Sequence, residues 1–198
     1  KCKLMINQQA EIAILIIAPI IMIFLLVAPY AITLLYSNKF TPITGFMQWA
    51  MLGMIFKAAS WAISFLYIAK GEMKLFAINE TIANIYVFSL SIFFYYLFGL
   101  DGLGIAFALS YFIYLIHYYL LSKKKFKFNF IKSFNKLFSI QLLLLVSCFL
   151  LVYLWKSNYV YIPTIILTLI CCIYSFKELD KRMELVKAIK NFRDGRRK

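Results

Sequence analysis

The sequence predicts an all-α polytopic membrane protein with six transmembrane helices. Of its 198 residues, 64% are hydrophobic and 15% are charged, whereas globular domains contain about 45–50% apolar and 25% charged residues. Several apolar runs are long enough to cross a bilayer, which takes about 20 residues of helix. Lysine and arginine gather in alternate connectors between these runs, the pattern of oriented spans.

The apolar runs set the order of the elements. We expect spans at residues 12–36, 46–69, 75–98, 102–121, 137–155 and 160–176. The connectors are short apart from 122–136, so consecutive helices should be antiparallel neighbours. Residues 1–176 then form one membrane domain, and residues 177–198 form a basic tail.

The first span follows a polar run, Asn7-Gln8-Gln9-Ala10-Glu11, which is suited to satisfy the free amides at a helix start. Pro19 and Pro29 lie inside the span, and each removes a backbone donor and is expected to bend the helix. Such a bend serves either as a hinge or as a packing detail.

The second and third spans each contain one charge, Lys57 and Glu80. A charge at membrane depth costs roughly 2.5–3.5 kcal/mol on insertion scales, so it is kept mainly where it faces a partner or water. At 1.5 Å per residue, Lys57 lies about 18 Å and Glu80 about 8–9 Å from the expected cytoplasmic ends of their spans. Two interpretations stay open: a strained ion pair, or a cationic site formed by Lys57 in an aqueous cavity.

Polar and aromatic residues recur at spacings of three and four around both charges, which favours one polar face on each helix. Two such faces on adjacent helices form either a salt-bridged interface or a cavity wall. The candidate substrate-binding residues are Lys57, Trp49, Ser60, Trp61, Glu80 and Asn84.

The fourth span opens with a glycine-rich turn, Gly99 to Gly104, and carries His117 near its end. We expect His117 to be interfacial, with a proton relay as the alternative. In residues 123–132 lysine alternates with phenylalanine, which predicts lysines that attract anionic lipid and rings that dip into the interface. The last two spans are nearly free of polar residues and are expected to be peripheral.

Charge sets the orientation. Nineteen of the 22 Lys and Arg fall on one side of the predicted spans, and only Lys39 and Lys156 fall on the other. Both termini are therefore expected in the cytoplasm. The tail places Leu179, Met183, Val186, Ile189 and Phe192 on one helical face, typical of a helix lying on the membrane surface.

Several function classes are disfavoured. The net charge of +14 follows the membrane pattern rather than a nucleic-acid surface. The four cysteines and scattered acids show no metal-ligand spacing and no paired acid and base groups, so we expect no metal, no cofactor and no enzyme activity. The chain starts Lys-Cys-Lys without a signal peptide, which suggests a piece of a longer protein.

The order of features resembles the C-terminal part of the oligosaccharide-lipid flippases, the Wzx-type O-antigen translocases of the MOP superfamily. The similarity runs over roughly residues 5–125. Three motifs carry it: the polar run at 7–11 followed by Pro19, the sequence LLYSNKF at 34–40 closing the first span, and GLDGLGIA at 99–106 opening the fourth.

The resemblance implies the C-terminal lobe of a MATE-like transporter with a central cavity, its N-terminal lobe absent from this chain. It implies transfer of a polyprenyl-diphosphate-linked oligosaccharide across the bacterial inner membrane for O-antigen or capsule synthesis. Implied partners are membrane lipids, the missing lobe and other glycan-assembly membrane proteins. A multidrug exporter of the same superfamily is the alternative, and an integral-membrane glycan-assembly enzyme is a more distant one.

Overall fold

The computed structural model describes residues 2–35, 43–154 and 161–183. These residues form five helices: α1 (Cys2–Leu35), α2 (Ile43–Ala69), α3 (Met73–Phe126), α4 (Lys132–Leu154) and α5 (Tyr161–Met183). All five are long and apolar enough to cross a membrane. By helix length and hydropathy, the chain is an all-α, multi-pass membrane protein.

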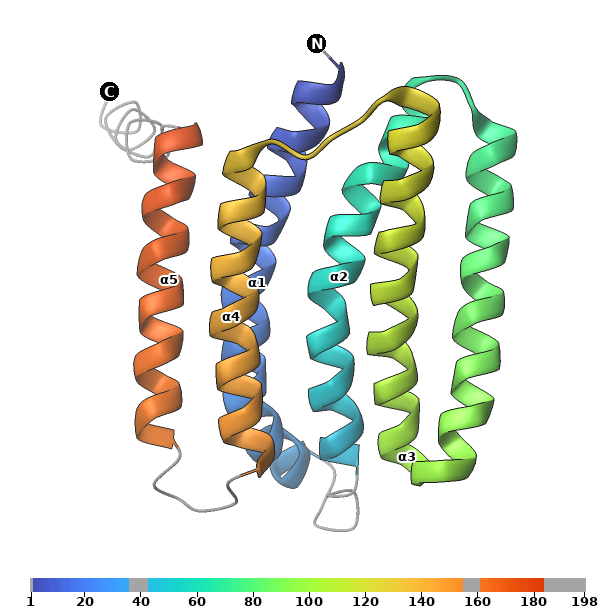
Figure 1. Cartoon of the computed structure of the whole chain (residues 1–198). Coiled ribbons are helices and arrows are strands. Elements are labelled where there is room, and N and C mark those ends of the chain that lie inside the picture. The colour runs from blue at the N-terminus through green and yellow to red at the C-terminus, as the bar shows by residue number, and fades with distance from the viewer. Residues whose placement is uncertain (1, 36–42, 155–160, 184–198) are drawn as a thin grey trace, which may run out of the picture.

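The predicted spans at 75–98 and 102–121 lie within one helix, α3, which is interrupted at Gly99. Gly99 has φ 60° and ψ −134°, a conformation that side chains other than glycine rarely adopt. Figure 1 shows α3 reversing direction there, so that a first arm (residues 73–98) and a second arm (residues 100–126) run side by side. The glycine-rich turn therefore lies where the sequence places it.

The start of α1 differs from expectation. The helix begins at Cys2, so the polar run at residues 7–11 lies inside it and does not cap it. Asn7 and Glu11 are 1% and 4% exposed. They are tolerated there because both have partners on distant parts of the chain, described below. The helix continues through Pro19 and Pro29.

The main core lies where α1, α2 and α4 meet. It contains Leu15, Met22 and Leu25 of α1 together with Ile55 of α2 and Leu145 of α4. The expectation that both last helices are peripheral is therefore wrong for α4. Helix α5 packs against α1 and α4 but leaves a row of isoleucines and leucines exposed.

The order of the helices also differs from the sequence prediction. Figure 1 shows the second arm of α3 lying between α2 and the first arm. The contact with α2 is close, since a Cβ on Gly53 would lie 2.9 Å from Ala108 Cα. A Cβ on Gly104 would lie 2.5 Å from the carbonyl oxygen of Phe46. Small residues thus let these two backbones approach, as in other membrane helix pairs.

The described basic connectors lie at one end of the bundle. Figure 1 shows the N-terminal end of α1, the turn at 70–72, the connector at 127–131 and the end of α5 together there. We call this the basic end. The single-side arrangement expected from the charge pattern is confirmed for these segments. Lys39, Lys156 and the tail beyond Met183 lie outside the described residues.

Candidate functional site

Lys57 lies on the side of α2 that meets the second arm of α3. Its side chain is half-buried, and its ammonium nitrogen lies 4.9 Å from the ring centre of Tyr111, 5.3 Å from that of Trp61 and 5.6 Å from that of Phe107. Each distance is within the range of a cation–π interaction. Within the described ranges, no carboxylate lies within ion-pair distance of Lys57. Among the described residues, the cation is therefore held by ring faces.

Glu80 lies on the first arm of α3 and faces the second arm. Its Oε1 accepts hydrogen bonds from the hydroxyls of Tyr114 and Tyr118, the latter at 3.4 Å. Both tyrosines are fully buried. The carboxylate is thus held by two neutral donors, and no cation pairs with it in the part of the chain that the structure describes.

Lys57 and Glu80 form no ion pair, and each instead contacts side chains of the second arm of α3. Tyr111 contacts the cation, and Tyr114 and Tyr118, one and two turns further along the same face of the second arm, donate to the carboxylate. The structure therefore shows neither a strained pair nor a shared polar face. One row of tyrosines thus contacts both charges, at different heights along the second arm.

The other four candidate residues lie in different surroundings. Trp61, 53% exposed, lies beside Lys57. Trp49 instead packs against α4, with ring centres 4.7 Å from Phe149. Ser60 is fully buried and donates to the carbonyl of Lys57 in its own helix, at 2.8 Å. Asn84 is exposed on the first arm of α3. Only Lys57 and Trp61 are brought together.

Lys57 and Trp61 point away from α4. The ring of Phe56 lies 6.4 Å from that of Phe138 on α4. At about 100° per residue, Lys57 is rotated from Phe56 by about 100°, and Trp61 by about 140°. Phe65 and Ile68 continue this stripe and are 43% and 39% exposed. We call Lys57, Trp61, Phe65 and Ile68 the uncovered face of α2.

Helix α1 has a matching stripe. Ile16, Ile20, Ile23 and Val27 are 45–58% exposed and recur at spacings of three and four. They are rotated by about 120–180° from Glu11, which faces α5. The α1 stripe therefore points away from α5, and the α2 stripe points away from α4. They carry one charge between them, Lys57.

A hollow of about 450 Å³ lies along α1 towards the basic end. Its described lining comes from one face of the helix, with Gln8 and Gln9 between Met5, Ile12 and Ala13. The two amides are exposed, unlike Asn7 and Glu11 on the opposite face of the same polar run. The polar run therefore places Asn7 and Glu11 inside the bundle and Gln8 and Gln9 on its surface.

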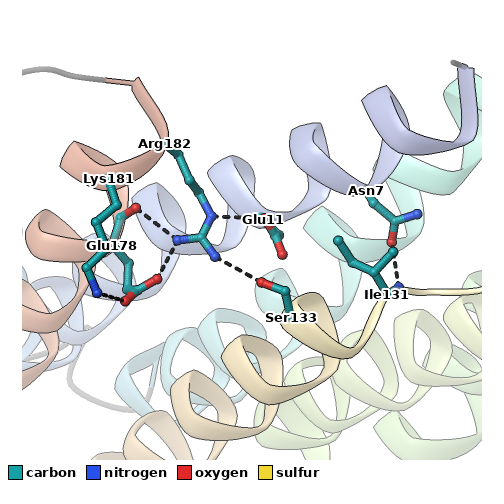
Figure 2. Close-up of polar contacts among 7 residues, drawn as sticks. All are labelled: Asn7, Glu11, Ile131, Ser133, Glu178, Lys181 and Arg182. Atoms are coloured by element: carbon teal, nitrogen blue, oxygen red, sulfur yellow. Dashed lines mark hydrogen bonds and ion pairs between the residues drawn. The ribbon is translucent and has the colours of Figure 1, made fainter.

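The basic end holds a second polar cluster that ties three helices together (Figure 2). Arg182 of α5 donates from Nε to Glu11 of α1 at 2.9 Å, and from Nη2 to the hydroxyl of Ser133 on α4 at 3.2 Å. Its Nη1 donates to Glu178 of its own helix. The other oxygen of Glu11 is buried and accepts no hydrogen bond from the described residues. We interpret this cluster as structural.

His117 is half-buried, with its ring near those of Tyr86 and Tyr118. Its Nδ1 atom is buried and has no hydrogen-bond partner among the described residues. Across these residues, no three His, Cys, Asp or Glu side chains gather as metal ligands.

Sequence reasoning missed Tyr111 and Phe107. The signal was present in the spacing, because residues 111, 114 and 118 are tyrosines one helical turn apart on the second arm. The fact that the second arm lies against α2 could not be derived from spacing.

Comparison with protein-family models, with curated proteins and with solved structures gives no match to this chain.

Proposed function

We propose that the chain is part of a flippase that moves polyprenyl-diphosphate-linked oligosaccharide from the inner to the outer leaflet of the bacterial inner membrane. The product would serve O-antigen or capsular polysaccharide synthesis. The proposal rests on one observation: Lys57 is a membrane-depth cation on an uncovered helix face, held without a carboxylate partner among the described residues.

The way Lys57 is held suits an anion that binds and leaves. A cation–π contact is worth about 0.5–2 kcal/mol, depending on its exposure to water. A hydrogen bond between an ammonium and a phosphate oxygen is worth about 1.5–3 kcal/mol and is shorter and more directional. A diphosphate can therefore replace ring contacts with stronger ones, without first displacing a carboxylate. After release, the rings again stabilise the ammonium.

The topology follows from the same proposal. Each arm of α3 crosses the membrane separately, which gives six crossings, and the basic end faces the cytoplasm because lysine and arginine gather there. The chain corresponds to the C-terminal lobe of a MOP-type transporter. The uncovered faces of α1 and α2 then form one wall of the transport cavity, and an N-terminal lobe forms the other. Other glycan-assembly membrane proteins supply the substrate and use the product.

The test uses the complete protein that contains this chain, reconstituted in liposomes with a labelled polyprenyl-diphosphate oligosaccharide. Transfer is measured as the fraction of the label that an added glycosidase reaches from outside. Lys57→Gln should slow transfer by more than tenfold, because one charged hydrogen bond to the diphosphate is lost. Lys57→Arg should retain much of the rate.

The matched control is Lys74→Gln, which removes the same charge from an exposed site on α3 at the basic end. It should leave the rate unchanged. Normal transfer by inserted Lys57→Gln protein would remove the site assignment. A wild-type protein that moves a cationic dye but not the glycolipid would favour the multidrug exporter instead.

A further inference from the structure

The basic end carries a row of exposed lysines on the connector between α3 and α4 and the helix ends beside it. Lys123, Lys124, Lys127 and Lys132 are all exposed, and we call them the lysine rim. Their neighbour Lys125 pairs with Glu72 at 2.7 Å. Within the described chain, no carboxylate lies within ion-pair distance of the four rim lysines. The rim therefore holds uncompensated positive charge.

The backbone beneath the rim is fixed by contacts within the protein. Phe128 is fully buried, and its amide donates to the carbonyl of Ser122 at 3.2 Å. Phe130 stacks on Phe134, with ring centres 4.1 Å apart. The expectation that these rings dip into the lipid interface is therefore wrong for Phe128. Its ring fills a gap between helices that the sequence pattern could not reveal.

Two side chains of α1 also form hydrogen bonds with this backbone. The side-chain oxygen of Asn7 accepts from the amide of Ile131 at 3.0 Å, as Figure 2 shows. The ammonium of Lys3 donates to the carbonyl of Lys127 at 3.1 Å. Because the backbone is already ordered, the rim loses less conformational entropy on binding a ligand than a flexible basic segment would.

We propose that the lysine rim is a preformed binding surface for the phosphate groups of anionic phospholipids. The rim lies at the end of a bundle of membrane-length helices (Figure 1), where lipid headgroups are the nearest anions. Each lysine near an anionic membrane surface contributes about fivefold in affinity, from roughly 1 kcal/mol per charge. The surface is distinct from Lys57, so it does not depend on the proposed transport function.

The experiment measures phosphatidylglycerol and phosphatidylcholine binding to the purified full-length protein, by native mass spectrometry of its lipid adducts. We expect phosphatidylglycerol to bind more tightly. Replacing Lys123, Lys124 and Lys127 together with Gln should weaken phosphatidylglycerol binding by about 100-fold, from roughly fivefold per lysine. The corresponding Arg variant should bind normally, as should Asn135→Gln, which alters an exposed uncharged residue of α4.

Two results would overturn the proposal. One is unchanged phosphatidylglycerol affinity in the triple Gln variant with an unaltered melting temperature. The other is equal affinity of the wild-type protein for the two lipids. Displacement of phosphatidylglycerol by equimolar inorganic phosphate, or by a short RNA, would refute the assignment to lipid. If the triple Gln variant does not fold, the wild-type protein is tested at increasing salt concentration. Added salt should weaken phosphatidylglycerol binding and leave phosphatidylcholine binding unchanged. Phosphatidylglycerol binding that does not depend on salt would overturn the proposal.

Discussion

The ion pair between Arg182 and Glu11 tests how α5 is held against α1. The Glu11 side chain is 5% exposed and that of Arg182 is 21% exposed, so both charges have lost most of their water. Replacing Arg182 with Leu leaves a buried carboxylate without its cation. This should lower the free energy of unfolding by about 3–5 kcal/mol. Glu11→Gln should cost only about 1 kcal/mol, because Glu178 still pairs with the arginine and the amide oxygen still accepts.

The double variant distinguishes this reasoning from simple loss of packing. Glu11→Gln combined with Arg182→Leu should be more stable than Arg182→Leu alone, because the unpaired charge is gone. The assay is equilibrium unfolding in mixed detergent micelles, followed by circular dichroism. Lys181→Leu is the control, since this lysine is 71% exposed and its pair with Glu178 is worth at most about 1 kcal/mol. A coupling free energy below about 0.5 kcal/mol between Glu11 and Arg182 would refute the argument.

The remaining predictions concern α3 and use the same unfolding assay. Glu80→Leu should lower the free energy of unfolding by about 1–3 kcal/mol, because two buried tyrosine hydroxyls lose their acceptor. Glu80→Gln should lower it clearly less, and equal losses in the two variants would contradict this. Gly104→Ala should cost about 1–3 kcal/mol, since its Cβ would meet α2 backbone at 2.5 Å. Gly71→Ala meets open space and should cost only about 1–2 kcal/mol, from its φ of 72°. Phe128→Ala should cost about 3 kcal/mol, because the ring is fully buried.

Much of the fold follows from local pattern. The apolar runs predict α2 and α4 to within a few residues, and Gly99 marks the reversal of α3. Hydrophobic length and helical period suffice for these features, because both are properties of a single segment. The same holds for the gathering of basic connectors at one end, which depends only on alternation along the chain.

The start of α1 could not be predicted in this way. Asn7 and Glu11 resemble a helix start because polar residues there usually satisfy free amides. Their partners, Ile131 and Arg182, lie more than 120 residues away in sequence. A polar residue inside a membrane helix is stabilised by whichever segment packs against it, and no local pattern identifies that segment.

The surroundings of Lys57 and Glu80 could not be predicted for a related reason. Short connectors suggested that α2 lies beside the first arm of α3, and this placed Lys57 opposite Glu80. In the structure the second arm lies against α2, with Gly53 and Gly104 allowing close approach. Small residues on two helices indicate that each can pack closely, but they do not say against which neighbour.

The arrangement of the two membrane charges bears on how a charged ligand would bind. An ion pair between Lys57 and Glu80 would satisfy both, yet it would oblige an incoming diphosphate to compete with a carboxylate. The tyrosines of the second arm prevent this: Tyr111 supplies a ring face to the cation, whereas Tyr114 and Tyr118 supply hydroxyls to the anion. Because phenols are neutral, neither charge is cancelled. Lys57 therefore meets a ligand on the uncovered face of α2 without a carboxylate partner among the described residues, and Glu80 is held by tyrosine hydroxyls further along the second arm.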